Sequence, residues 1–83
     1  MRPTDSDLLR LFVEQGRQES FTELVSRRID LVYAAALRQV GGDAHRAQDI
    51  TQQVFIDLAR KAASVSRHSS VLGWLYTSTP ETV

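Results

Sequence analysis

The feature that most constrains the fold is the spacing of apolar residues between positions 43 and 63, in the segment DAHRAQDITQQVFIDLARKAA. At 100° per residue, a helix through this segment gathers its apolar side chains on one broad face. That face comprises Ala47, Ile50, Thr51, Val54, Phe55, Leu58 and Ala62. Most of the stability of such a helix comes from burying its apolar face, so we expect it to pack against other helices.

The opposite face of the same helix has an unusual mixture of side chains. It carries Asp49, Gln52, Gln53, Ile56 and Arg60 within about one third of the circumference. A face that meets only water rarely places an isoleucine among hydrogen-bonding groups, so this face is predicted to bind a protein partner. The alternative is that the isoleucine is one of the single exposed apolar residues that are normal on protein surfaces.

A shorter amphipathic segment precedes this helix. Thr4 or Asp5 can cap the first free amides of a helix, and acidic residues suit its positive end. Leu8 and Phe12 follow at helical spacing, and Gly16 is a typical residue for ending a helix. The pattern therefore predicts a first helix that ends near this glycine.

A second, longer helix should begin within residues 18–20, with the glutamate or serine of that segment near its cap, and run to Val40. Gly41 and Gly42 break the helical pattern, and Asp43 can cap the third helix. Because this connection is short, the second and third helices are expected to form an antiparallel hairpin.

One charged residue, Arg28, lies in the centre of the apolar stripe of the second helix. Its long side chain can snorkel to water. Alternatively, it can point inward and pair with an acid on another helix, for which Asp49 and Asp57 are the candidates. The sequence leaves these two interpretations open.

The segment 64–70 is polar, rich in serine and without helical periodicity, so we expect a loop there. Ser69 or Ser70 can cap a short fourth helix over residues 71–76, which Pro80 would stop. The predicted fold class is all-α: a small helical bundle of three main helices and a short C-terminal fourth. We expect a single domain over residues 1–83, ordered from about 4 to 79.

Composition excludes several classes of function. A chain of 83 residues has room for one small domain, and its formal net charge of zero argues against a free-standing nucleic-acid binder. There is no cysteine, and neither His45 nor His68 has a carboxylate at ligand-like spacing, so we expect no metal and no cofactor. No known catalytic motif occurs, which predicts a protein that is not an enzyme. Without an apolar run that could span a bilayer or serve as a signal peptide, we expect no membrane association and a cytoplasmic location.

At the third helix the sequence resembles a known family. The segment AQDITQQVFIDL at 47–58 is similar to the A-E-D-hydrophobic-x-Q-E-V-F-x-x-L signature of region 2 of bacterial sigma factors, of the extracytoplasmic-function (ECF) type in the sigma-70 family. The flanking segments FTELVSRR at 21–28 and GWLY at 73–76 agree with the same family. The resemblance covers roughly residues 4–79, and it implies a sigma-factor region that acts in transcription initiation.

The resemblance implies a partner for the outer face of the third helix. In the family this helix docks on the clamp helices of the β′ subunit of core RNA polymerase. Asp49, Gln52 and Gln53 fall on the matching motif positions, and Ile56 and Arg60 extend the same face by geometry. These five residues are the predicted RNA polymerase-binding site.

The resemblance also implies contacts with promoter DNA. In the family, the loop after this helix and the helix that follows recognise the minus-ten element as single-stranded DNA and help to melt it. The corresponding residues here are Lys61, Arg67, His68, Trp74 and Tyr76. Two alternatives stand beside this: the tryptophan can be a core anchor, and the arginine and histidine can be merely solvated.

The sequence departs from the family in three ways. Gln48 and Gln53 stand where the family usually has acids, the fourth helix stops early, and the helix-turn-helix region four is missing. We therefore expect a polymerase-docking half that binds promoter DNA weakly or not at all on its own. An anti-sigma factor is a further implied partner. A homodimer through apolar surface near Leu72 and Leu75, at the truncated C-terminal edge, is a further hypothesis.

The competing hypothesis is a generic helical interaction module without a role in transcription. It would use the same face of the third helix for another protein.

Overall fold

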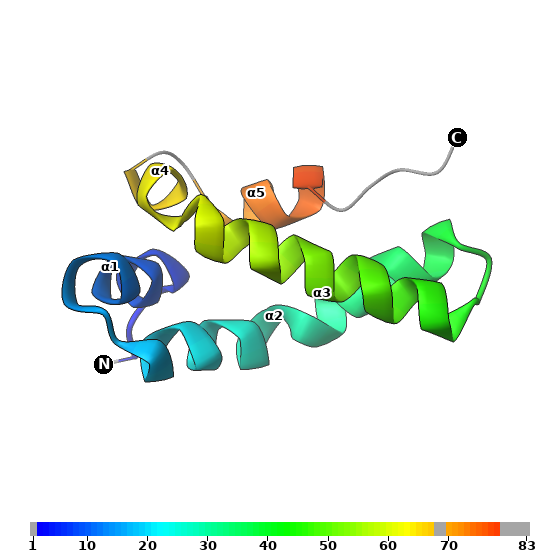
Figure 1. The fold of residues 1–83 in the computed structure, drawn as a ribbon, viewed down its shortest axis with the longest axis horizontal. Coiled ribbons are helices and arrows are strands. Elements are labelled where there is room, and N and C mark those ends of the chain that lie inside the picture. Colours follow the sequence, from blue (N-terminus) through cyan, green and yellow to red (C-terminus); the bar gives the residue numbers. More distant parts are fainter. Residues whose placement is uncertain (1, 68–69, 79–83) are drawn as a thin grey trace.

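The computed structural model describes residues 2–67 and 70–78, and these residues form a small bundle of helices (Figure 1). The helices are α1 (Asp5–Gln15), α2 (Gln18–Gln39), α3 (Ala44–Arg60), α4 (Ala62–Arg67) and α5 (Val71–Ser78). No strand occurs within these two ranges. The predicted all-α class, with three main helices and a short C-terminal one, is confirmed, and α4 is an addition to it.

The centre of the fold is a long hairpin of α2 and α3 (Figure 1). Gly41 and Gly42 turn the chain with φ of 63° and 87°, values that glycine adopts at no steric cost. The Asp43 side chain then accepts a hydrogen bond from the backbone N–H of Arg46 at 3.2 Å and caps α3. The predicted turn and cap are confirmed.

Helix α1 also begins and ends at the residues that the sequence indicated. The Thr4 hydroxyl accepts from the backbone N–H of Asp7, and the Asp7 carboxylate accepts from the backbone N–H of Thr4, both at 3.0 Å. Gly16, with φ of 64°, ends the helix. Helix α2 begins at Gln18, within the predicted range, but its N-cap is Arg17 and not the predicted glutamate or serine, and no side chain caps it.

The cap of α1 gives a pH-dependent prediction. The backbone N–H of Thr4, its hydroxyl and the nearby Arg10 together hold the pKa of Asp7 below its usual range. A carboxyl group with a lowered pKa in the folded state stabilises the fold above its ordinary pKa, and the contribution is lost as the pH falls through the folded value. Asp7→Asn should therefore be less stable than the wild type at pH 7, with a difference that shrinks below about pH 4. Thermal unfolding followed by circular dichroism at pH 7 and pH 3 measures this, and an equal difference at both values would contradict it.

The core lies between the α2–α3 hairpin and the three shorter helices. Its fully buried large side chains are Leu9, Leu24, Val32, Leu58, Val71 and Leu75. Every residue of the predicted inward face of the third helix is buried or partly buried. The apolar pattern that defined this helix is therefore the pattern of its packing.

The predicted loop over residues 64–70 is wrong in its first half, because residues 62–67 form α4. Ala62 and Val65 are buried, at 3% and 6% exposure, and they lie three residues apart on one face. This face packs chiefly on α1, and the burial compensates for the weak helix propensity of Ser64 and Ser66. Lys61 interrupts α3 with φ of −102°, which separates the two helices.

Helix α5 begins as predicted, because the Ser70 hydroxyl accepts from the backbone N–H of Gly73 at 3.1 Å. It runs to Ser78, two residues further than expected, and Pro80 lies outside the described residues. Leu75 is fully buried, so the expectation that it offers apolar surface for a dimer was wrong. Leu72 is partly exposed, and a dimer at this edge stays a prediction with reduced support.

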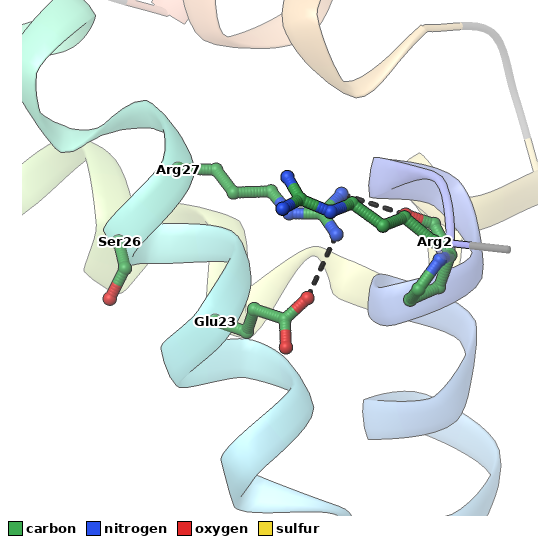
Figure 2. Close-up of a pocket in the computed structure, with 5 residues that line it drawn as sticks. Arg2, Glu23, Ser26 and Arg27 are labelled. Carbon is green, nitrogen blue, oxygen red and sulfur yellow. Dashed lines mark hydrogen bonds and ion pairs between the residues drawn. The ribbon is translucent and has the colours of Figure 1, made fainter.

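An ionic cluster joins the start of α1 to α2. Arg28 Nε donates to Asp5 Oδ2 at 2.7 Å, so the arginine pairs with α1 and not with the two acids of α3 that the sequence suggested. Arg27 donates to the Pro3 carbonyl at 2.7 Å and pairs with Glu23 at 2.8 Å (Figure 2). The cluster fixes the N-terminal segment against α2 and leaves the outer face of α3 free of these charges.

Candidate protein-docking face

The outer face of α3 presents all five predicted polymerase-binding residues to solvent: Asp49, Gln52, Gln53, Ile56 and Arg60. We call this surface the docking face. Ile56 is 47% exposed, a large value for an isoleucine in a folded chain of this size. The structure thus brings the five residues together on one side of one helix.

The polar groups of the docking face are largely unpaired. Gln53 Nε2 donates to Asp57 Oδ1 at 3.0 Å, which holds that carboxamide along the helix. Within residues 2–67 and 70–78, neither Asp49 nor Arg60 takes part in an ion pair. Their charges are therefore available to a partner.

An apolar groove runs between α2 and α3 along the edge of the docking face. It is lined by Phe21, Val25, Ile29, Thr51, Gln52, Phe55, Ile56 and Ala59. Towards the α2–α3 turn it continues into a second hollow bordered by Asp30, Tyr33 and Gln48. Exposed apolar surface beside hydrogen-bonding groups is the usual composition of a protein interface.

Sequence reasoning missed the contribution of α2 to this surface. Ile29 is 40% exposed and lines both parts of the groove. A helical projection of α2 alone places Ile29 at the border of the buried stripe, so the pattern predicts that it is a core residue. Only the antiparallel packing of α3, which puts Gln52 beside it in the groove wall, shows that Ile29 borders the docking face.

The predicted DNA-binding residues have different environments. Lys61 and Arg67 are exposed at the two ends of α4, and Tyr76 is 55% exposed on α5. Trp74 packs against the core, which favours its interpretation as an anchor. The two aromatic residues are two positions apart in a helix and so point in different directions. His68 lies outside the described residues.

Two other kinds of site are not supported by the part of the chain that the structure describes. It contains no group of histidines and acids that could hold a metal ion, and no helix with the length and apolar character needed to cross a membrane. The hollow bordered by Arg2 and Arg27 is a second surface feature (Figure 2). Glu23 and the Pro3 carbonyl already bind Arg27 there, so the hollow is best explained as part of the ionic cluster.

Comparison with known proteins agrees with this architecture. Residues 24–81 match the family model of sigma-70 region 2, so the chain belongs to this family, in its ECF type. The chain is 32% identical over 74 residues to the ECF RNA polymerase sigma factor SigE of Mycolicibacterium smegmatis (strain ATCC 700084 / mc(2)155). This similarity covers 89% of the chain but 28% of the relative, so the chain spans less than a third of that protein's length. No solved structure matches the chain.

Proposed function

We propose that this chain is the core-polymerase-binding part of a sigma factor, and that its docking face binds the clamp helices of the RNA polymerase β′ subunit. The observation that carries the proposal is the exposed Ile56, which lies between unpaired polar groups at the edge of an apolar groove. Membership of the sigma-70 region 2 family supports the same role.

The physical basis of binding would be an apolar centre with a polar border. Ile56 and Ile29 would lose their contact with water when a helix lies along the groove, and such buried anchors supply most of the affinity of an interface. Gln52 would fix the register through hydrogen bonds. Asp49 would favour a basic partner, chiefly by increasing the association rate.

Promoter contact is the second element of the proposal. The exposed Lys61 and Arg67 would meet phosphates, and the exposed ring of Tyr76 would stack on an unpaired base of the minus-ten element. The formal net charge of zero gives this chain little non-specific attraction to DNA. We therefore expect promoter binding to require prior docking on the polymerase.

The test is binding to an isolated β′ clamp-helix fragment, measured by calorimetry. A Gln52→Ala/Ile56→Ala double variant should bind at least about tenfold more weakly, because it loses one buried anchor and one hydrogen-bonding group. The matched control is Val13→Ala/Glu14→Ala on α1, which removes one exposed apolar and one exposed polar side chain away from the groove.

Two results would contradict the proposal. One is a folded wild-type chain that does not bind the fragment, which would favour the generic interaction module. The other is equal loss of binding in the α1 control, which would place the interface elsewhere. An Ile29→Ala variant then tests the part of the groove that α2 supplies.

A further inference from the structure

The docking face has opposite charges at its two ends. Asp49 and Arg60 are eleven residues apart on α3, about 16 Å along the helix axis. Both are exposed, and neither has an ionic partner among residues 2–67 and 70–78. A surface that is acidic at one end and basic at the other is complementary to a copy of itself turned end for end.

The spacing along this face fits the same arrangement. Residues 49, 53, 56 and 60 follow one another at intervals of four, three and four, which is the seam spacing of two helices packed side by side. When two copies of α3 lie antiparallel about a two-fold axis and Asp49 faces the partner's Arg60, Gln53 faces the partner's Ile56.

We propose that, in the free protein, a second copy of this chain covers the docking face through an antiparallel α3–α3 contact. The contact is isologous: Asp49 of each copy pairs with the partner's Arg60, and the exposed Ile56 and Ile29 of both copies are withdrawn from water. The groove beside α3 supplies the apolar area that one helix seam alone would lack.

This inference concerns how access to the docking face is regulated. Its consequence for polymerase binding rests on the proposed function. The residues that dimerisation covers are the residues proposed to meet the polymerase, so the two associations exclude each other. The free protein would be a dimer, and only the monomer would bind the polymerase.

The experiment is sedimentation of Asp49→Arg, Arg60→Asp and wild-type protein over a range of concentrations. The wild type should form a dimer as its concentration rises, and each variant should associate at least about tenfold more weakly because like charges then face each other. An equimolar mixture of the two variants should dimerise again, since both ends of the mixed pair unite an acid with an arginine.

A matched control distinguishes dimer formation in this register from simple attraction between proteins of opposite net charge. Arg60→Asp protein, labelled at its amino terminus, carries a net charge of −2, while Asp49→Arg and Glu14→Arg each carry +2, relative to zero in the wild type. The labelled protein should dimerise with excess Asp49→Arg protein, where both ends of the pair unite an acid with an arginine, and at least about tenfold more weakly with excess Glu14→Arg protein, whose unchanged α3 matches it at one end only.

A wild type that stays monomeric at several hundred micromolar would overturn the inference, and so would equally tight dimers with both charge partners. Neither result bears on binding to the β′ clamp-helix fragment, which is measured separately. Absence of fragment binding at concentrations where the wild type is monomeric, with dimers at higher concentration, would overturn the proposed function alone.

Discussion

Replacing Phe55 by alanine should lower the free energy of unfolding by about 3–5 kcal/mol. The ring is 7% exposed and belongs to the core cluster between α2 and α3. Truncation removes its buried apolar area and leaves a cavity that the tightly packed hairpin can fill only partly. Because small domains are stable by only about 5–15 kcal/mol, this loss would take a large share of the total. Chemical denaturation followed by circular dichroism measures it.

The neighbouring residue supplies the control for this prediction. Ile56→Ala removes a side chain of comparable size that is 47% exposed, so its cost should stay below about 1 kcal/mol. The contrast tests the orientation of α3 directly. Equal losses at the two positions would mean that the helix is rotated about its axis relative to the structure.

The second large effect should follow from Asp5→Ala, with a loss of about 1–3 kcal/mol. The Asp5 side chain is 12% exposed, accepts from Arg28 Nε at 2.7 Å and lies 3.5 Å from Arg27 Nη1. Its removal leaves two guanidinium groups without their shared carboxylate. The loss stays below that of a fully buried pair because Arg27 and Arg28, at 26% and 31% exposure, can still reach water.

A double-mutant cycle with Arg28→Ala separates the pair from other effects of the substitution. The coupling should be favourable and should account for much of the single-variant loss. Asp49→Ala is the matched control, since Asp49 is exposed and makes no ion pair within the described ranges, and its effect should be within about 0.5 kcal/mol. Additive losses at residues 5 and 28 would show that the pair contributes nothing to stability.

The parts of the fold that could be predicted from the sequence are those that local chemistry determines. Asp43, Gly16 and the capping box of Thr4 act within a few residues of chain, so their positions follow from residue type. The buried and exposed faces of α3 follow from periodicity, and the docking face was predicted with them.

The remaining parts depend on contacts between segments far apart in sequence. Helix α4 was missed because its serines favour a loop, while its stability comes from Ala62 and Val65 packing on α1. The predicted partner of Arg28 was wrong, because the apolar pattern of α2 does not show which helix packs against the helical turn that contains this arginine. The role of Ile29 required the relative placement of two helices, which no single helical pattern contains.

The packing of α4 on α1 also affects the order in which the chain folds. Besides α2, which follows it directly, α1 packs on α4, whose Val65 lies 50 residues beyond the end of α1, so at roughly 5–20 residues per second this second contact forms several seconds later during synthesis. The α2–α3 hairpin, joined by a short turn, can form in the meantime. Because the contact between α4 and α1 closes a longer loop than the α2–α3 turn, pulse-labelling hydrogen exchange during refolding should show protection of the hairpin amides before those of α4. The N-terminal helix is the first to be made, and its packing is completed only when α4 has been synthesised.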